Sequence, residues 1–436
     1  MMIRITFARA LVLAAMYAAA GHAAAETPVL AGTVTPADAL VRRALASNRE
    51  LAAARLDVTR ARARVRQSSL RPNPVLELEQ TGGALGISNG EIERRAEISM
   101  PIEYGGQRSR RIGLAEAELR AAEAVFSDRE RRLAAGVRRL YAEAIAATRE
   151  LSFTNELTQI DTEIGNVLQI RVREGDAPPL EESLLRVEID RLRSRHAMLE
   201  GRRRAAELQL ATVIGASPEE TIALAESYGE GVAVPSREDA VRLALERRPD
   251  LRAADLNIAA AEAGLSLAKG QALPEVTVFG GYSRGRSSFD DTPVGPLVDE
   301  DQLINAGVGI SLPFFNRNQG AKAEAAAAIE QARRLRELTE SQIRAEVESA
   351  LARLRAADAA IEVFRQGVIE RSAQNVRTMR AAYEAGAFTI SEFLAERRRF
   401  VDAQRELTEA MTERAVALID LQAAVAEPIA TNEESK

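Results

Sequence analysis

The chain has 436 residues, with 58 Lys and Arg against 64 Asp and Glu, and it contains no Cys and no Trp. The acidic balance disfavours a nucleic-acid partner, and the lack of Cys excludes disulfides, thiolate catalysis and a lipidated N-terminal Cys. Only 4% of the residues are aromatic while Ala is abundant, a composition that suits closely packed long helices better than large globular cores.

The first 25 residues have the three-part layout of a secretory signal peptide. Arg4 and Arg9 precede an apolar run over residues 10–20, and a run of Ala ends at Ala25. A membrane anchor is the alternative, but the apolar run is shorter than the about 20 residues that a helix needs to cross hydrocarbon. We therefore expect a mature chain outside the cytoplasm.

An internal repeat is the strongest sign of organisation. Residues 44–51, ALASNREL, align with residues 244–251, ALERRPDL, and Pro74 meets Pro274 at the same shift of 200. Such self-similarity predicts one domain built twice from the same plan. We expect a single domain over residues 26–436 with duplicated halves at about 36–215 and 236–427. Each half would run helix, strand pair, very long helix, tight turn and return helix.

Four short segments show the alternation of strands with one apolar face, and they lie near residues 74–81, 92–101, 274–283 and 303–313. From Ile304 to Leu312 every second residue is apolar, and the intervening residues are Asn, Gly or Ser. In a soluble sandwich the apolar face would turn inward, whereas in a membrane sheet it would face lipid. Strands of about ten residues suit a tilted membrane crossing, which favours lipid. Because spanning barrels need at least about eight strands, several chains would have to pool theirs.

Two very long helices are predicted, over residues 108–174 and 320–384. The first segment has no Pro, and apolar residues such as Leu157, Ile164 and Leu168 recur in it at helical spacing. A helix of that length would extend for roughly 100 Å at ~1.5 Å per residue. A rod-like coiled-coil scaffold is the alternative, but a scaffold does not need amphipathic strands and a signal peptide.

Two turn segments accompany the duplicated plan: YEAGAFTISEFL at residues 383–394 and its weaker partner REGDA at residues 173–177. With these features the sequence resembles the TolC superfamily of outer-membrane efflux proteins along nearly the whole mature chain. The resemblance implies a mainly α fold with a small transmembrane β part. Four strands per chain would complete a twelve-strand barrel in a homotrimer, and the long helices would form a coiled-coil α-barrel across the periplasm.

Three joint segments resemble the cobalt-zinc-cadmium resistance subgroup: RPNP at residues 71–74, EYGGQR at 103–108 and LPFFNRNQG at 312–320. The resemblance implies a passive exit duct in the outer membrane that receives heavy-metal cations from a periplasmic adaptor and an inner-membrane pump of the resistance-nodulation-division type. A multidrug or type I protein-secretion duct is the alternative. We interpret these joints as structural, since Pro ends strands and Gly or Asn permits sharp re-entry into helix. The joint residues are Pro74, Pro101, Pro274, Pro313 and Gly320.

The two turns after the long helices are predicted to form the periplasmic tip that docks the adaptor. Gly at a helix end permits a left-handed cap that reverses the chain, and an exposed aromatic side chain beside it suits a partner surface. The alternative is that these segments are only turns. The predicted tip residues are Gly175, Asp176, Ala177, Tyr383, Gly386, Ala387 and Phe388.

An acidic ring at the aperture is implied by the resemblance. Glu392 stands six residues after Gly386, and Glu181 stands six residues after Gly175. Three carboxylates near one axis would attract cations and repel anions. The alternative is that Glu392 is a solvated helix residue paired with a neighbour such as Arg397.

No catalytic or metal centre emerges from the sequence. His196 is the only His after the signal peptide, and it lies among several Arg, whereas a zinc or copper site needs clustered imidazole or thiolate ligands. No nucleophile and base occur at a characteristic spacing. We expect no enzymatic activity, no cofactor and no nucleic-acid partner, and outer-membrane lipid as the surroundings.

Overall fold

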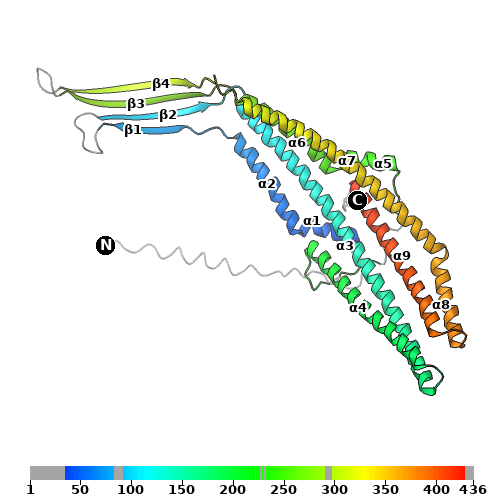
Figure 1. The fold of residues 1–436 in the computed structure, drawn as a ribbon. Helices are drawn as coiled ribbons and strands as arrows, with labels where there is room; N and C mark the ends of the chain where they lie inside the picture. Colours follow the sequence, from blue (N-terminus) through cyan, green and yellow to red (C-terminus); the bar gives the residue numbers. More distant parts are fainter. Residues whose placement is uncertain are drawn as a thin grey trace, which may run out of the picture.

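The computed structural model describes residues 35–82, 92–220, 222–225, 228, 232–289 and 297–427. The described chain is elongated (Figure 1): a sheet projects from one end of a set of long helices, and two helical hairpins turn at the opposite end. The expected signal peptide, residues 1–25, lies outside the described residues. The expected mainly helical fold with four strands is confirmed.

The two halves present their elements in the same order. The first half has α1 (Ala37–Ser47), α2 (Arg49–Ser69), β1 (Val75–Thr81), β2 (Ile92–Ile102), α3 (Gln107–Glu174) and α4 (Pro179–Val213). The second half has α5 (Arg237–Arg247), α6 (Pro249–Gly270), β3 (Val276–Phe289), β4 (Leu297–Ile310), α7 (Gln319–Val363), α8 (Ile369–Glu384) and α9 (Ile390–Ala424). The first predicted long helix is confirmed, because α3 runs unbroken for 68 residues.

The second predicted long helix is interrupted, contrary to expectation. A π-helix of 5 residues, Phe364–Val368, separates α7 from α8, and within it Gly367 has φ 143°. A Cβ at that position would lie 2.9 Å from the Arg371 guanidinium. Arg371 in turn donates through Nε to the Gly367 carbonyl at 3.0 Å. Gly tolerates this backbone conformation because it has no Cβ, so one residue carries the break in the helix.

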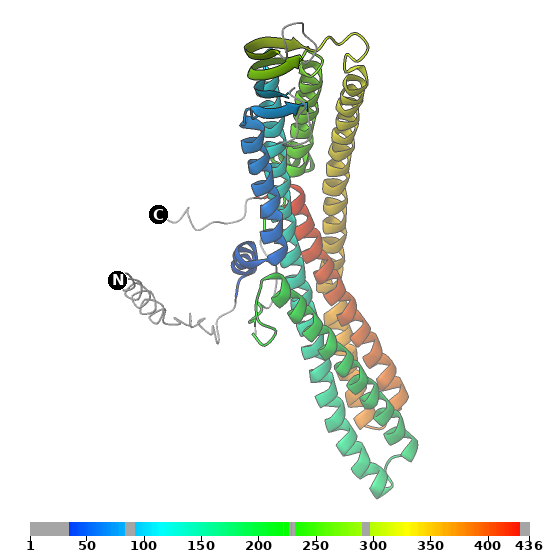
Figure 2. The same ribbon diagram turned by 90° about the vertical axis from the view of Figure 1, so that its left-hand side faces the viewer.

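Helix α3 is the axis against which helices of both halves pack (Figure 2). Along one side α4 and α2 follow each other nearly end to end, and along the other side α9 and α6 do the same. At the first junction the Asn48 amide donates to the Val213 carbonyl at 2.9 Å. At the second junction Arg131 donates to the Ala423 carbonyl at 2.8 Å. The first bond gives the last carbonyl of α4 a partner, and the second ties α3 to the end of α9.

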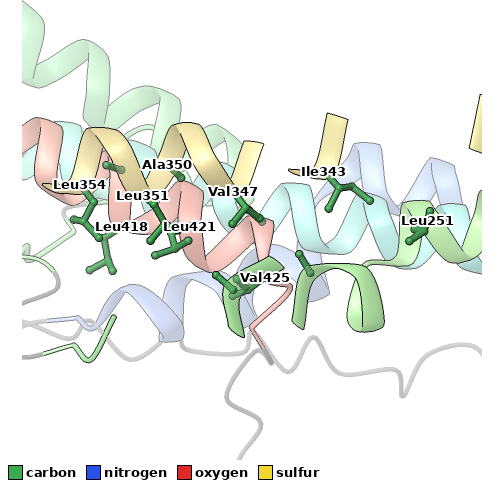
Figure 3. Packing of buried hydrophobic residues seen from close by; sticks show 13 residues of the cluster. Leu251, Ile343, Val347, Ala350, Leu351, Leu354, Leu418, Leu421 and Val425 are labelled. Carbon is green, nitrogen blue, oxygen red and sulfur yellow. The ribbon is translucent and has the colours of Figure 1, made fainter. Parts of the chain in front are cut away.

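The largest apolar cluster surrounds the second junction (Figure 3). It is made of aliphatic side chains from α5, α6, α7 and α9, and among those labelled in the figure are Leu251, Ile343, Val347, Ala350, Leu351, Leu354, Leu418, Leu421 and Val425. Several members are Ala, which lets helix axes approach closely. A matching cluster around Val137 and Tyr141 joins α1, α3 and α4 at the first junction. The two largest apolar clusters of the described residues therefore lie at mid-length, between the sheet and the tips.

The described strands form one antiparallel sheet in the order β1-β2-β3-β4. Its register brings most of the apolar residues of the four strands to one face, since paired residues point the same way. That face carries Leu76, Leu78, Ala96, Ile98, Met100, Ile102, Val276, Val278, Tyr282, Ile304, Ala306, Val308 and Ile310. The other face is mainly polar and carries Glu77, Glu79, Glu93, Arg95, Glu97, Ser99, Thr277 and Asn305, together with the apolar residues Val75, Phe279 and Leu303.

The strand ends differ from the predicted limits. Strand β2 continues through Pro101, which pairs with Thr277, to Ile102. Pro is tolerated there because β1 begins only at Val75, opposite Ser99, so that part of β2 has one neighbouring strand. Strands β3 and β4 extend for 14 residues each because polar residues beyond the apolar stretch also pair. Pro313 lies beyond the end of β4.

The turns from sheet to helix depend on residues in left-handed conformation. Gly106 (φ 77°) precedes α3, and Asn318 (φ 56°) precedes α7. The Asn318 amide also donates to the Ala268 carbonyl at 2.8 Å. Gly320 lies inside the first turn of α7, so Asn318 makes the turn there. Pro74 and Pro274 stand just before β1 and β3.

Candidate functional site

The two hairpin turns close in the same way. Gly175 (φ 83°) follows α3, and Gly386 (φ 74°) lies just after α8. In each turn the next N–H bonds a carbonyl five residues back: Asp176 to Arg171 at 2.8 Å, and Ala387 to Ala382 at 2.8 Å. This is the Schellman arrangement, which needs a left-handed residue and favours Gly. No described atom lies within 4 Å of where a Cβ would stand on either Gly, so backbone conformation, not space, selects Gly.

A shared apolar cluster joins the two hairpins below their turns. It contains Leu168, Ala177, Leu185, Tyr383, Ile390, Phe393 and Leu394. The Tyr383 ring stacks on Phe393 at 6.2 Å between centroids, and the Arg171 guanidinium lies 5.7 Å from the same tyrosine ring. The structure thus brings the separately predicted turns together through buried contacts between α3, α4, α8 and α9.

Tyr383 and Glu181 link the hairpins by a hydrogen bond. The Tyr383 hydroxyl donates to Glu181 Oε2 at 2.9 Å, across 202 residues of sequence. Burial, reinforced by the neighbouring carboxylate, raises the pKa of Tyr383 to about 12. The phenol therefore stays protonated at neutral pH and remains a donor to Glu181. Of the two predicted aperture acids, Glu181 is held by a partner from another helix.

The outermost tip residues are exposed. Gly175, Asp176, Gly386 and Ala387 are exposed, whereas Ala177 is buried in the shared cluster. Phe388 is 44% exposed although it is a large apolar residue. The turns therefore present an open surface with an aromatic side chain on it.

Glu392 is exposed but locally engaged. Its Oε2 accepts hydrogen bonds from the Thr389 N–H at 2.9 Å and the Thr389 hydroxyl at 2.8 Å. The Glu392 N–H donates back to the Thr389 hydroxyl at 3.4 Å, which completes a capping box at the start of α9. The backbone N–H first, and then the hydroxyl, lower the pKa of Glu392. The spacing Thr389-x-x-Glu392 is the sequence signal for this cap.

The alternative interpretation paired Glu392 with Arg397, but Arg397 is not a surface residue. Its side chain is 4% exposed and forms an ion pair with Asp161, which is fully buried. Glu188 lies 3.9 Å from Arg397 and accepts a hydrogen bond from Arg398 at 2.9 Å. Burial, and then the nearby Arg398, lower the pKa of Arg397 to about 10, so the guanidinium is still charged at neutral pH.

This buried charge cluster, Asp161, Glu188 and Arg397, ties α3, α4 and α9 together above the tips. Sequence reasoning missed it. The available signal was Asp161 within the otherwise apolar stripe of α3, four residues after Leu157 and seven before Leu168. A charge at such a position is costly unless a partner is supplied by a neighbouring helix.

Removing one member of the pair should destabilise the tip strongly. Arg397→Met is expected to lower the free energy of unfolding by about 3–5 kcal/mol, because Asp161 is left charged and buried. The double variant Asp161→Leu/Arg397→Met should regain most of that loss. Denaturant titration of the purified protein in detergent measures both. Arg398→Met, whose side chain is 53% exposed, is the matched control with a smaller expected effect, and equal losses in the single and double variants would contradict the assignment.

Over the described residues, no group of three or more His, Cys, Asp or Glu side chains is placed to hold a metal ion. Within the same part of the chain, no helix is both long enough and apolar enough to cross a membrane.

Comparison with known proteins places these features in a family. The model of the outer membrane efflux protein family matches residues 40–216 and 240–427. The cobalt-zinc-cadmium resistance protein CzcC of Cupriavidus metallidurans is 26% identical over 386 residues, covering 86% of this chain and 84% of CzcC. The pyoverdine export outer membrane protein OpmQ of Pseudomonas putida is 27% identical over 421 residues, covering 89% of this chain and 84% of OpmQ.

Solved structures share the fold. CusC superposes with a TM-score of 0.74 at 21% identity, covering 89% of this chain and 91% of CusC. VceC of Vibrio cholerae superposes with a TM-score of 0.73 at 18% identity, covering 90% of this chain and 97% of VceC. The expected TolC-like fold is thereby confirmed. Because the family model matches most of the chain, this protein belongs to the outer membrane efflux protein family and resides in the outer membrane, as the family description states.

Proposed function

We propose that this protein is the exit duct of a tripartite efflux system. It would passively conduct substrates from an inner-membrane pump of the resistance-nodulation-division type, through a periplasmic adaptor, to the outside. The observation that carries the proposal is the joining, in one family-matched chain, of an amphipathic sheet to helices of up to 68 residues. Such helices extend for roughly 100 Å at ~1.5 Å per residue, a length suited to reaching a partner deep in the periplasm. The duct supplies a path and no catalytic step.

The duct would be a homotrimer. In the described sheet β1 and β4 each pair along one side only, and unpaired backbone groups at a sheet edge are costly in lipid. Three copies of the four-strand sheet would give twelve strands, enough for the edges to pair between protomers and for the sheet to close. The apolar face would then meet lipid, and the polar face would line the lumen.

Heavy-metal cations are the proposed substrates. The joint segments at residues 71–74, 103–108 and 312–320 support this, as does the relative that is named a cobalt-zinc-cadmium resistance protein. The pyoverdine exporter, whose sequence identity to this chain is similar, favours a second candidate, a duct for organic molecules such as drugs. A type I protein-secretion duct is the other alternative.

Deletion of the gene tests the function. Growth of the deletion strain should become sensitive to zinc, cobalt or cadmium and should recover when the gene is returned on a plasmid. Unchanged growth on metals together with sensitivity to drugs would favour the second candidate.

Cross-linking of the complementing protein in mild detergent should give trimers, and monomers alone would contradict the duct.

Glu392 is proposed to form an acidic ring in the aperture of the trimer. Two variants separate charge from helix capping: Glu392→Gln removes the charge but keeps a side chain that can complete the capping box, whereas Glu392→Ala removes both. Single-channel recording in planar bilayers should show reduced cation preference and weaker block by multivalent cations in both variants. If only the Ala variant changes, the carboxylate acts as a cap and not as a ring.

The hairpin turns are proposed to dock the adaptor. Gly386→Val should abolish metal resistance while trimers persist in the outer membrane, because a β-branched residue resists the left-handed conformation that the turn requires. Gly386→Asn is the matched control, since Asn tolerates that conformation, and it should retain resistance. Co-purification of adaptor with each variant reports docking directly, and full resistance with Gly386→Val would refute the proposal.

A further inference from the structure

The outer end of the sheet, away from the helices, sorts its charges by face. On the face that is apolar nearer the helices, the described strand residues beyond the apolar rows include Arg94, Arg284, Arg286 and Glu300. At the same end, the opposite face carries Glu79, Glu93, Asp299, Asp301 and Arg95. One face therefore has an excess of positive charge, and the other has a larger excess of negative charge.

The arginines are exposed and incompletely paired. Arg284 pairs with Glu300 at 2.9 Å, and Arg94 donates to the neutral Gln80 amide oxygen at 3.2 Å. Arg94 and Arg284 are direct register partners on neighbouring strands. Like charges directly opposite each other destabilise a sheet. An anion held between the two guanidinium groups would offset their repulsion and would accept hydrogen bonds from their free N–H groups.

The height of the arginines on the sheet identifies the anion. The apolar stripe of β4 continues past the strand end to Leu312, which is 65% exposed. Gln302 pairs with Arg284 and precedes Leu312 by ten residues. Ten residues at about 3.4 Å each span about 34 Å, or about 26 Å along the membrane normal for a tilt of about 40°. Since the apolar band of such a sheet is about 25 Å tall, the arginines would lie level with the headgroups of the outer leaflet.

We propose that Arg94, Arg284 and Arg286 form a binding site for the phosphate groups of phosphorylated glycolipids in the outer leaflet. The guanidinium groups bind phosphate oxygens through charge-assisted hydrogen bonds, and the apolar rows below them contact the acyl chains. This inference rests on the proposed membrane orientation of the sheet, because only that orientation places these side chains outside the lumen.

The site is tested by measuring the binding of lipid A to the purified trimer with native mass spectrometry in detergent. The variant Arg94→Gln/Arg286→Gln keeps the Arg284–Glu300 pair and should weaken binding by about tenfold or more through the lost charge-assisted bonds. Arg95→Gln is the matched control, since Arg95 is adjacent in sequence but on the opposite face, and it should bind as the parent does. Unchanged binding in the double variant, or an equal loss in the control, would overturn the site.

Two measurements on the parent protein keep the test independent of variant folding. Dephosphorylated lipid A should bind at least about tenfold more weakly than the phosphorylated form if the arginines bind the phosphate groups. Inorganic phosphate at millimolar concentration should not compete. Equal binding of both lipids, or full competition by inorganic phosphate, would refute a lipid-phosphate site. A chain that forms no trimer in the cross-linking experiment would contradict the proposed duct. A trimer that binds no lipid A would contradict this site alone.

Discussion

The packing of α3 against helices from both halves is the interaction on which the rest of the structure depends. Its 68 residues contact α2 and α4 on one side and α6 and α9 on the other. Neither pair forms a continuous helix, so each junction exposes helix ends that need partners. The Asn48 and Arg131 side chains bond carbonyls there. The two apolar clusters surround the same level of the molecule, so a single helix aligns the sheet with the tips.

Charge follows position along this axis. At mid-length and above the tips, two arginines are buried and paired: Arg248 with Asp250, and Arg397 with Asp161. In the sheet, charges are exposed and are separated by face. Buried pairs fix helices relative to one another because an unpaired partner is costly. Exposed charges add little to stability, so their sorting by face is better explained by what each face meets.

The sequence revealed long-range periodicity well and local exceptions poorly. Helix α3 and the apolar alternation of four strands were predictable because each pattern repeats over many residues. The break at Gly367 was not, since an isolated Gly within a helical pattern is usually tolerated. The role of Arg397 was also hidden, because its partner Asp161 lies 236 positions away in sequence, on another helix. By contrast, Thr389-x-x-Glu392 was a readable capping signal that the interpretation as an aperture acid overlooked.

The two acids of the tips differ in what holds them. Glu392 is bonded to Thr389 within its own helix turn, so its position follows α9 alone. Glu181 is bonded to Tyr383, which joins the start of α4 to the end of α8. Any motion that separates the hairpins must break the second bond and leaves the first intact. Because the pKa of Tyr383 is raised to about 12, the phenol stays protonated near neutral pH. The Tyr383–Glu181 bond therefore responds to the relative position of the hairpins and not to deprotonation of the phenol.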